Sequence, residues 1–551
     1  MSHNKKLITT EMLTGEFHVT KNTKYKHMKN VQRLYNIALI GLSVAVIATS
    51  CNKVDQFGNT NVNPNGATQP ITGALLTTVE AQIGHINAID NFFNFGALYC
   101  QYSTQTQYGD KGRYGIPQVE YSMTAYNESG TGATIGLYSG PMADCQTIIN
   151  KNTDPATIAF AGQSGSNVNQ IAIAKILKSY IMWTITDRWG DVPYSEALTA
   201  NITNNVTPKY DAQKDIYLKM FADLKSAANS LDASGAALKG DIIFAGDISK
   251  WKKTANSLRM LMALRLSKVY PNAGDVAATE FANADVSGGI TDNADNFQLT
   301  YAGGNLKNPY FAMYDGRSDF GECKTFYDIL AGLGDTRQSV YGTSSTAFPY
   351  GMGDDAARAF GTANPGYSRN LAAAFRTATS TIVMVPASIV LLARAEAIER
   401  GWINGNGRTN YEAAIAQSFA QWGLTVPAGY INSSTVDYDL GTGVTSPVGQ
   451  SSANTIPATS KAVTATKIDR IALQRYIALY PDGGQSWAEW KRTGIPQLQP
   501  TSEALGKQIP RRYVYPVNER AYNPNSVNDA VAKMPYGGKD DQDSRVWWDK
   551  Q

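Results

Sequence analysis

Long stretches of the chain carry apolar residues three or four positions apart, the spacing that places them on one face of a helix. Residues 211–232 show it most clearly, with a stripe made of Tyr217, Met220, Phe221, Leu224, Ala228 and Leu231. Asp211 is the predicted N-cap of this helix. The same spacing predicts helices over residues 71–84, 168–186, 249–270, 386–402, 411–423 and 467–480.

Two of these stretches, 386–402 and 411–423, are close in sequence and rich in alanine. Gly401 stands where a helix-ending glycine is expected, and Tyr411 opens the second stretch. A unit of this kind resembles a tetratricopeptide-type hairpin. The chain shows no strict repeat period, so we expect degenerate repeats.

Strand signals are confined to residues 241–245 and to RYVYPV at 512–517. Residues 100–140, 285–385 and 425–465 are rich in Gly, Ser, Thr, Asn and Tyr, and loops this long are usually functional or mobile. We therefore predict a mostly α fold. Tetratricopeptide-like hairpins would form its scaffold, with long irregular segments and a few short β-strands packed on it.

The apolar run between Arg33 and Cys51 has a different character from these helices. It is interrupted by polar residues and is shorter than the roughly 20 apolar residues of a spanning helix. Lys29 and Arg33, the core IALIGLSVAVIA and the small residues ATS have the layout of a secretory signal. The cysteine directly after them resembles a bacterial lipobox, in which the thiol is lipidated and the chain is then cut before it.

This interpretation divides the chain into three parts. Residues 1–50 form a presequence, with translation expected to start at Met28. Residues 51–70 form a polar tether with lipidated Cys51 at its start, and residues 71–551 form a single domain. An ordinary signal peptide followed by an incidental cysteine is the alternative.

Removing the presequence changes the charge of the protein. It contains seven of the 49 Lys and Arg and two of the 46 Asp and Glu, which leaves 42 basic and 44 acidic residues. A near-neutral chain gives no reason to expect nucleic acid or an anionic membrane surface as a partner. Only His85 of the four histidines remains, which excludes a two-histidine zinc motif.

The remaining chemistry in the sequence is sparse. The motifs G-x-S-x-G, G-x-x-x-x-G-K-[ST], H-E-x-x-H and C-x-x-C are absent, so we expect neither cofactor nor metal. The three carboxylates of DGRSDFGE (315–322) could hold calcium, but they lack the alternating spacing of a calcium loop, and a solvated turn is the favoured interpretation. Cys100, Cys145 and Cys323 allow at most one disulfide, and their spacing leaves the pair open.

Three carboxylates follow the long helix predicted at 168–186, namely Asp187, Asp191 and Glu196. Paired carboxylates of this kind serve glycoside hydrolysis. The structural alternative is a turn. In it the aspartates accept hydrogen bonds from backbone N–H groups, Gly190 adopts a conformation that other residues avoid, and Pro193 restricts the backbone. A surface-anchored glycoside hydrolase therefore stays as an alternative function.

Several segments, taken together and in order, resemble the SusD-like (SusD/RagB) nutrient-binding outer-membrane lipoproteins, and the closing WWDK is similar to a starch-binding-associated subgroup. They are DRWGDVPYSEA (187–197), GDISKWKKTANSL (246–258), LARAEA (392–397), EWKRTGIP (489–496) and IPRRYVYPVNE (509–519). The resemblance extends over residues 51–551. Lys491 stands where arginine is common, and Pro386, Ala387 and Ser388 stand where an acidic residue is frequent.

The resemblance implies a protein without enzymatic activity or cofactor, anchored by lipid in the outer membrane and facing outside. It implies a role as the lid of a SusC-like TonB-dependent barrel that takes up oligosaccharides or, in some members, peptides. The motif residues are expected to be scaffold. They are Asp187, Arg188, Gly190, Asp191, Pro193, Trp251, Asn256, Glu396, Trp490, Arg492, Arg511 and Arg512.

Tyrosines of the irregular segments are the candidate ligand-binding residues, because an aromatic face with a hydroxyl tip suits a sugar ring. The candidates are Tyr108, Arg113, Tyr114, Tyr310, Tyr314 and Tyr350, with Asp110 as a polar partner of Arg113. The alternative is that these tyrosines pack loops onto helices. A further alternative is a helical-repeat scaffold that binds no small ligand.

Overall fold

A computed structural model of the chain divides into two units, Met1–Gln69 and Pro70–Gln551. The structure describes residues 69–88, 95–117, 121–126, 132–439, 466–501, 503–505 and 508–550. The predicted signal, the start at Met28 and the lipidated Cys51 lie outside the described residues. Everything that follows on structure concerns the second unit.

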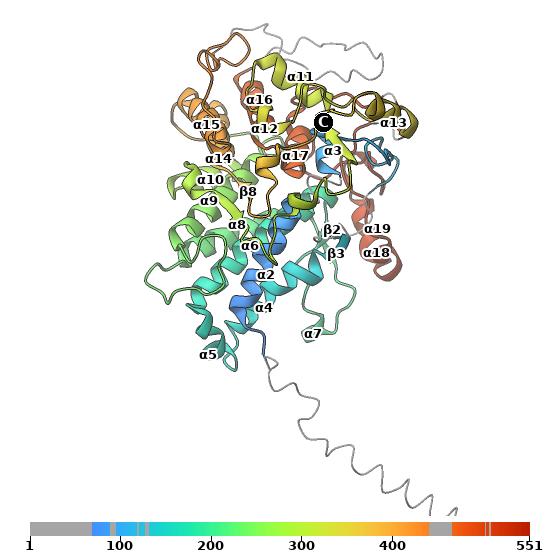
Figure 1. Ribbon diagram of the computed structural model, residues 1–551. Helices are drawn as coiled ribbons and strands as arrows, with labels where there is room; N and C mark the ends of the chain where they lie inside the picture. The colour runs from blue at the N-terminus through green and yellow to red at the C-terminus, as the bar shows by residue number, and fades with distance from the viewer. Residues whose placement is uncertain are drawn as a thin grey trace, which may run out of the picture. The chain divides into compact units, whose positions relative to one another are not determined.

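Helices dominate the described residues, which confirms the predicted fold class (Figure 1). Each helix predicted from the apolar spacing is present. They are α2 (Thr72–His85), α6 (Asn167–Trp189), α8 (Gln213–Ser230), α9 (Ile248–Arg265), α14 (Ala387–Glu399), α15 (Gly407–Gln421) and α16 (Lys467–Ala478). The predicted stripe of α8 is buried.

The predicted N-cap of α8 is wrong, because Ala212 occupies that position and Asp211 lies in a strand. The carboxylate of Asp211 accepts hydrogen bonds from the backbone N–H groups of Tyr194 and Ser195, at 3.1 and 2.7 Å. Asp191 caps the N-terminus of α8 instead, since its Oδ1 accepts a hydrogen bond from the N–H of Gln213 at 2.8 Å.

Shorter helices lie between and after the long ones. They are α3 (Gly96–Tyr99), α4 (Ala143–Lys151), α5 (Ile158–Ala161), α7 (Ala200–Thr203), α10 (Val276–Val286), α11 (Lys324–Leu333), α12 (Gln338–Tyr341), α13 (Asp354–Ala363), α17 (Gly483–Thr493), α18 (Val517–Tyr522) and α19 (Pro524–Ala532). Three of them, α11 to α13, interrupt the segment 285–385 that the sequence predicts to be irregular.

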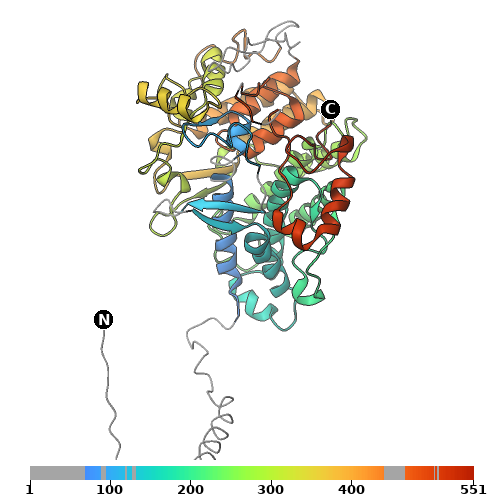
Figure 2. The same ribbon diagram turned by 90° about the vertical axis from the view of Figure 1, so that its right-hand side faces the viewer.

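The strands form four separate antiparallel pairs and no larger sheet among the described residues. The pairs are β1 (Ser103–Gln105) with β7 (Phe320–Glu322), β2 (Ser122–Tyr126) with β3 (Gly132–Gly136), β4 (Val192–Pro193) with β5 (Tyr210–Asp211), and β6 (Phe297–Thr300) with β8 (Thr381–Val385). Figure 2 shows β2 and β3 side by side in front of the helices.

Both strand predictions from the sequence are wrong. Residues 241–245 form a turn around the Asp241 side chain, whose Oδ1 accepts from the N–H groups of Ile243 and Phe244 at 3.0 and 2.9 Å. Residues 512–516 form no strand, since Arg512 lies in a bend and α18 begins at Val517.

The helices α8, α9, α10, α14 and α15 follow one another along one side of the unit (Figure 1). Helices α14 and α15 form the predicted hairpin, and Gly401 ends α14 with a φ of +69°. The N–H groups of Gly401 and Trp402 donate to the carbonyls of Ile398 and Ala397, which is a Schellman-like ending. The predicted role of Gly401 is thus confirmed.

The motif residues of the C-terminal half join distant helices. Glu396 of α14 is fully buried and accepts hydrogen bonds from Arg492 of α17 and Arg475 of α16. Arg511 pairs with Asp549 at 2.6 Å and lies over the ring of Trp490 at 5.2 Å. Arg512 pairs with Asp540 at 2.8 Å. These contacts tie the C-terminal segment to the helical scaffold.

The motif residues of the N-terminal half are also structural. Trp251 donates from Nε1 to Asp241 Oδ2 at 2.8 Å, and Asn256 donates from Nδ2 to the carbonyl of Gly288 at 2.9 Å. Gly190 has a φ of +89°, which only glycine adopts readily. Pro193 accepts from the hydroxyl of Tyr138 at 2.8 Å, and the guanidinium of Arg188 lies 5.7 Å from the Tyr513 ring centre.

Candidate functional site

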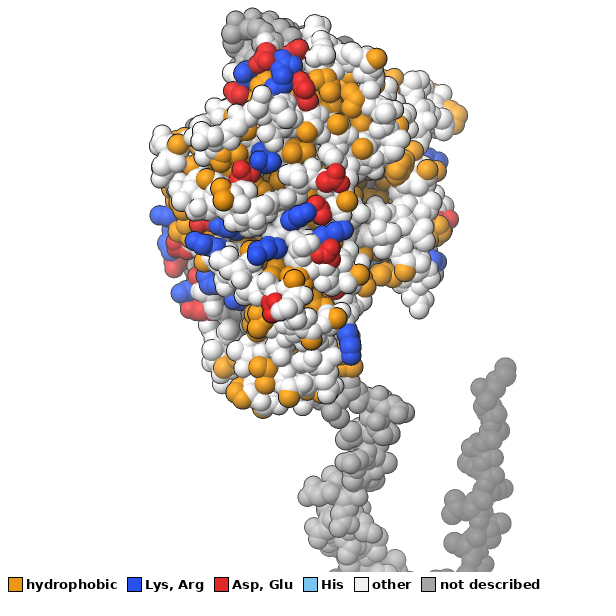
Figure 3. Space-filling model, turned by 90° about the vertical axis from the view of Figure 1, so that its left-hand side faces the viewer, with side chains coloured by type: hydrophobic (Ala, Val, Ile, Leu, Met, Phe, Trp, Pro, Cys, Tyr) orange, Lys and Arg blue, Asp and Glu red, His pale blue; other side chains and the backbone are white. Residues whose placement is uncertain are grey.

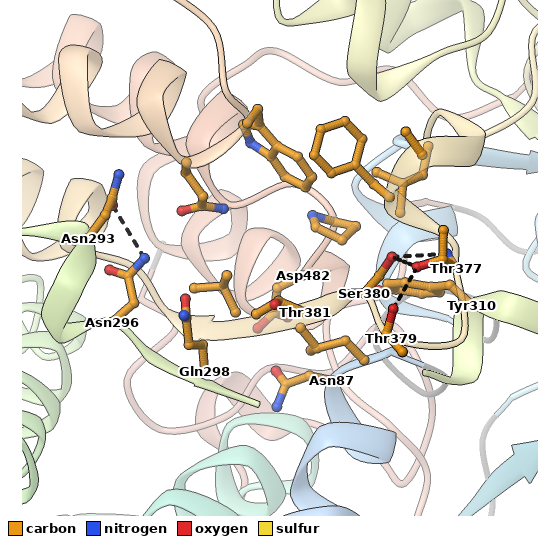
Figure 4. A pocket seen from close by; sticks show the side chains of 18 of the residues that line it. Asn87, Asn293, Asn296, Gln298, Tyr310, Thr377, Thr379, Ser380, Thr381 and Asp482 are labelled. Carbon is orange, nitrogen blue, oxygen red and sulfur yellow. Dashed lines mark hydrogen bonds between the residues drawn. The ribbon is translucent and has the colours of Figure 1, made fainter. Parts of the chain in front are cut away.

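A pocket of about 500 Å³ opens where the β6–β8 pair meets the end of α15 and the residues just before α17. Figure 4 shows Asn293, Asn296 and Gln298 along one side of it and Thr377, Thr379, Ser380 and Tyr310 along the other, with Thr381 and Asp482 between them. The pocket is lined mainly by amide and hydroxyl groups. It therefore offers both donors and acceptors to a ligand.

Aromatic rings complete the lining. Trp422, at the C-terminal end of α15, and Phe375 both line the pocket, with ring centres 5.1 Å apart and planes at 75°. Both side chains are half-buried. Aromatic faces next to amide groups can stack on the apolar face of a ring-shaped ligand while the amides bond its rim.

Two of the amide side chains that line the pocket differ in their hydrogen bonding. Asn296 Nδ2 donates to Asn293 Oδ1 at 3.3 Å, and Asn296 Oδ1 accepts from the N–H of Ala387 at 2.7 Å, which fixes the orientation of this side chain. Gln421 Oε1 is buried and has no hydrogen-bond partner within the described part of the chain. A buried acceptor without a partner costs free energy, and a ligand donor in the pocket would remove that cost.

Asp482 is the one charged side chain that lines this pocket among the described residues. It caps α17, because its Oδ1 accepts from the N–H of Gln485 at 3.0 Å. Burial raises the pKa of Asp482 to about 6. With a single carboxylate and no cation in its lining, the pocket suits an uncharged, polar ligand.

The structure distributes the six predicted ligand-binding residues over several places. Tyr310 lines the pocket, although its side chain is largely buried. Tyr314 lies between two guanidiniums, 5.0 Å from that of Arg369 and 4.7 Å from that of Arg376, and its hydroxyl accepts from the N–H of Asn370 at 2.9 Å. These contacts hold the Tyr314 ring in place, and Tyr314 is not among the described residues that line the pocket.

Tyr114 and Tyr350 are core residues. Their hydroxyls lie 2.8 Å apart, and Tyr350 also donates to the carbonyl of Leu98 at 2.8 Å. Both rings are buried, so neither has a face open to a ligand. The alternative interpretation, in which tyrosines pack loops onto helices, holds for these two, and we keep neither in the proposed site.

Tyr108 and Arg113 belong to a separate loop that does not contribute to the pocket. Tyr108 is 67% exposed. The loop is fixed by the N–H of Gly109, which donates to Asp354 Oδ1 at 2.8 Å. Arg113 pairs with Asp110 at 3.1 Å, and its Nη1 lies 4.0 Å from Glu503. This loop presents one aromatic face on a rigid support.

The carboxylates considered for hydrolysis have structural partners. Asp187 is buried, and its Oδ1 accepts from Tyr217 and from Trp548 Nε1, while Oδ2 lies 3.6 Å from Arg265. Asp191 caps α8 as described above. Glu196 accepts from Asn205 Nδ2 at 3.0 Å and from the N–H of Lys209 at 3.1 Å. Asp191 and Glu196 thus hold a helix end and a turn, whereas Asp187 joins α6 to α8, α9 and the C-terminal segment and is buried.

Sequence reasoning missed the main lining residues. Tyr411, Ile415 and Phe419 of α15 are buried. Trp422 follows the last residue of α15 and lines the pocket. The polar residues of the pocket resemble ordinary loop residues in the sequence. The one usable signal is the prediction that segment 285–385 carries function.

Within the described part of the chain, no group of three or more His, Cys, Asp and Glu is placed to hold an ion. In the turn 315–322, Asp319 pairs with Arg317 and Glu322 is buried. Cys100, Cys145 and Cys323 are buried free thiols. Among the described helices, none has the length and apolarity needed to span a bilayer.

Comparison with known proteins identifies a sequence family and solved structures that this chain resembles. Residues 64–516 match the SusD-like sequence family described as "Starch-binding associating with outer membrane". A chitin-binding SusD homologue from Flavobacterium johnsoniae is 24% identical with a TM-score of 0.68, over 87% of this chain and 99% of its own. A SusD homologue from Bacteroides fragilis is 22% identical with a TM-score of 0.68, over 88% of this chain and 100% of its own.

A third solved structure, described as a chitin-binding protein, is 24% identical with a TM-score of 0.65, over 87% of this chain and 100% of its own. No curated protein sequence matches the chain. At these identities the structural likenesses establish the fold.

Proposed function

The chain belongs to the SusD-like family described as starch-binding in association with the outer membrane, and from this membership we propose that it binds an oligosaccharide nutrient there. The observation that carries the proposal is the pocket of about 500 Å³ that combines Trp422 and Phe375 with amides and hydroxyls. Its volume lies within the range of small-molecule sites. The exposed Tyr108 is a candidate second contact for a longer chain.

The composition of the lining favours a neutral saccharide over a peptide. A peptide carries charged ends and often charged side chains, whereas the pocket offers only the carboxylate of Asp482. A sugar presents hydroxyls that both donate and accept, which Gln298, Gln421 and the threonines can match. The two chitin-binding relatives bind a saccharide as well.

The family and the sequence support a proposal for the attachment and the partner of this protein. Cys51 is the proposed lipidated residue, and residues 51–70 form the tether that links it to the fold. We infer that the protein faces outside and acts as the lid of a SusC-like TonB-dependent barrel. It has no catalytic role in this proposal, and Asp187, Asp191 and Glu196 act as scaffold.

Calorimetry with the mature chain tests which class of ligand it binds. We expect binding to starch-derived or chitin-derived oligosaccharides, no binding to a mixed peptide pool, and no shorter products by chromatography. Trp422→Ala should weaken binding at least about tenfold, which corresponds to about 1.4 kcal/mol. The matched control is Tyr522→Ala, because Tyr522 is an exposed aromatic of α18 outside the pocket.

Three results would contradict this part of the proposal. They are equal loss of affinity in both variants, binding of peptides alone, and turnover of an oligosaccharide that Asp191→Asn abolishes. The anchor has a separate test, since Cys51→Ala should release the protein from membranes. Isolation of the wild-type protein without a TonB-dependent barrel from gently solubilised membranes would argue against the lid role.

A further inference from the structure

One end of the folded unit exposes apolar side chains close to the residue where the tether joins the fold. Ile71, directly before α2, and Val168, in the first turn of α6, are half-exposed, and Ile158 and Phe160 of α5 are also exposed. Exposure of one such side chain is ordinary, but a group of them marks an interaction surface.

The three segments that carry these side chains contact one another. Thr72 Oγ1 of α2 donates to the carbonyl of Ala161 in α5 at 3.4 Å. Asn167 Nδ2 of α6 donates to the carbonyl of Ile158 in α5 at 3.0 Å. The first turns of α2 and α6 and the short helix α5 are thus one connected part of the surface.

Helix α7 adds two more side chains at the same end. Ile202 is 71% exposed and Val206, just after the helix, is 79% exposed. Figures 1 and 2 both place α7 and α5 at one end of the unit. We call the surface of Ile71, Ile158, Phe160, Val168, Ile202 and Val206 the apolar end. It carries six of the 15 large hydrophobic side chains that are exposed on the described residues.

Charged residues are rare on this surface. Residues 155–168 and 197–208 contain no Lys, Arg, Asp or Glu. Figure 3 shows the lower end of the unit as mostly uncharged side chains with apolar atoms among them, whereas charges of both signs lie higher up. The apolar end is therefore unsuited to an ionic partner.

We propose that the apolar end rests on the lipid bilayer, with its Ile, Val and Phe side chains in the interfacial region. The proposal rests on the anchoring at Cys51 proposed above. Cys51 precedes Pro70 by nineteen residues, and a flexible chain of this length spans on the order of 25 Å on average. A lipid on Cys51 would therefore hold this end of the fold, rather than the pocket, near the membrane.

A bilayer fits this surface better than a protein partner does. A stable protein interface buries about 800 Å² on each side with close shape complementarity. Six side chains on separate short segments provide much less area, but single apolar side chains do insert among lipid headgroups. Exposed Lys239 lies beside Gly73 and Ser164 at this end, but the six side chains of the apolar end carry no charge. The contact should therefore weaken little with salt and should not require anionic lipid.

Site-specific fluorescence on the acylated mature chain tests the proposal. The three cysteines at 100, 145 and 323 are buried and Cys51 would be alkylated by its lipid, so a single introduced cysteine can be labelled selectively. Phe160→Cys and Ile202→Cys place the dye on the apolar end. Val286→Cys is the matched control, because Val286 is 89% exposed at the end of α10, away from α5 and α7 (Figure 1).

On phosphatidylcholine vesicles, iodide quenching should fall about threefold at positions 160 and 202, consistent with a depth of roughly 5–10 Å, and should stay unchanged at 286. The fall should be the same at low and high salt. Equal quenching at all three positions, in a protein that still floats with the vesicles, would refute the contact and leave the anchor intact.

Two further outcomes would also overturn the proposal. Shielding at 160 and 202 that occurs in native membranes but not on lipid vesicles would assign the apolar end to a protein partner. Failure of the acylated chain to float with vesicles would reject the anchor on which the proposal rests.

Discussion

Arg492 holds Glu396 through two parallel hydrogen bonds, from Nη1 to Oε1 at 2.6 Å and from Nη2 to Oε2 at 2.8 Å. Arg475 donates to the same carboxylate at 2.6 Å, and Arg400 pairs with it at 2.7 Å. Helices α14, α16 and α17 therefore meet on one buried acid. Burial opposes its ionisation, but the three guanidiniums outweigh burial and hold the pKa of Glu396 well below its usual range.

Replacing Glu396 should destabilise the fold strongly. Glu396→Ala removes one of the two carboxylates that the buried Arg475 and Arg492 share, the other being Glu489. The lost pairing should lower the free energy of unfolding by roughly 3–5 kcal/mol. Urea denaturation followed by circular dichroism measures the change. Glu412→Ala is the control, since Glu412 pairs with Arg408 at 3.1 Å on the surface and should cost less than about 1 kcal/mol. Similar losses in both variants would contradict this account.

Glu322 should make stability fall as the pH rises. Its side chain is buried, and burial raises its pKa from 4.5 to about 8. Between these values the folded state binds a proton that the unfolded state has lost, so stability declines by about 1.4 kcal/mol per pH unit. Glu322→Gln removes the titrating group and should flatten this dependence. The measurement is the urea midpoint between pH 5 and 8, and an unchanged slope in the variant would disprove the assignment.

Binding in the pocket should depend on the ionisation of Asp482. The carboxylate accepts hydrogen bonds more strongly than the neutral acid, and burial raises its pKa to about 6. Oligosaccharide affinity should therefore increase as the pH rises from 5 to 7. Asp482→Asn keeps a residue that caps helices well and should remove the pH dependence. The measurement is calorimetry at several pH values. A variant that retains the wild-type dependence of affinity on pH would exclude Asp482 as a ligand contact.

The three thiols at 100, 145 and 323 should react only after unfolding. All three are buried, and burial raises the pKa of Cys323 to about 12. Thiol titration of the Cys51→Ala protein should detect no free thiol in buffer and three in denaturant without reductant. A count of one in denaturant would instead indicate that two of them form a disulfide.

Helical periodicity is a local property, and the sequence by itself therefore predicted the long helices. The stripe from Tyr217 to Leu231 and the ending of α14 at Gly401 both follow from spacing along one segment. The motifs identified the family for the same reason, because each is a short continuous run. The short strands escaped prediction, since pairs such as β4 with β5 involve two residues on each side and leave no period.

Only the tertiary structure decided which polar and aromatic residues meet. Gln298, Trp422 and Asp482 lie far apart in sequence, and the fold places β6, the end of α15 and the residue before α17 around one pocket. Tyr108 and Tyr114 are six positions apart in one Tyr-rich segment, yet one is exposed and the other is buried. Composition cannot separate such residues, because burial depends on what the rest of the chain places over each ring.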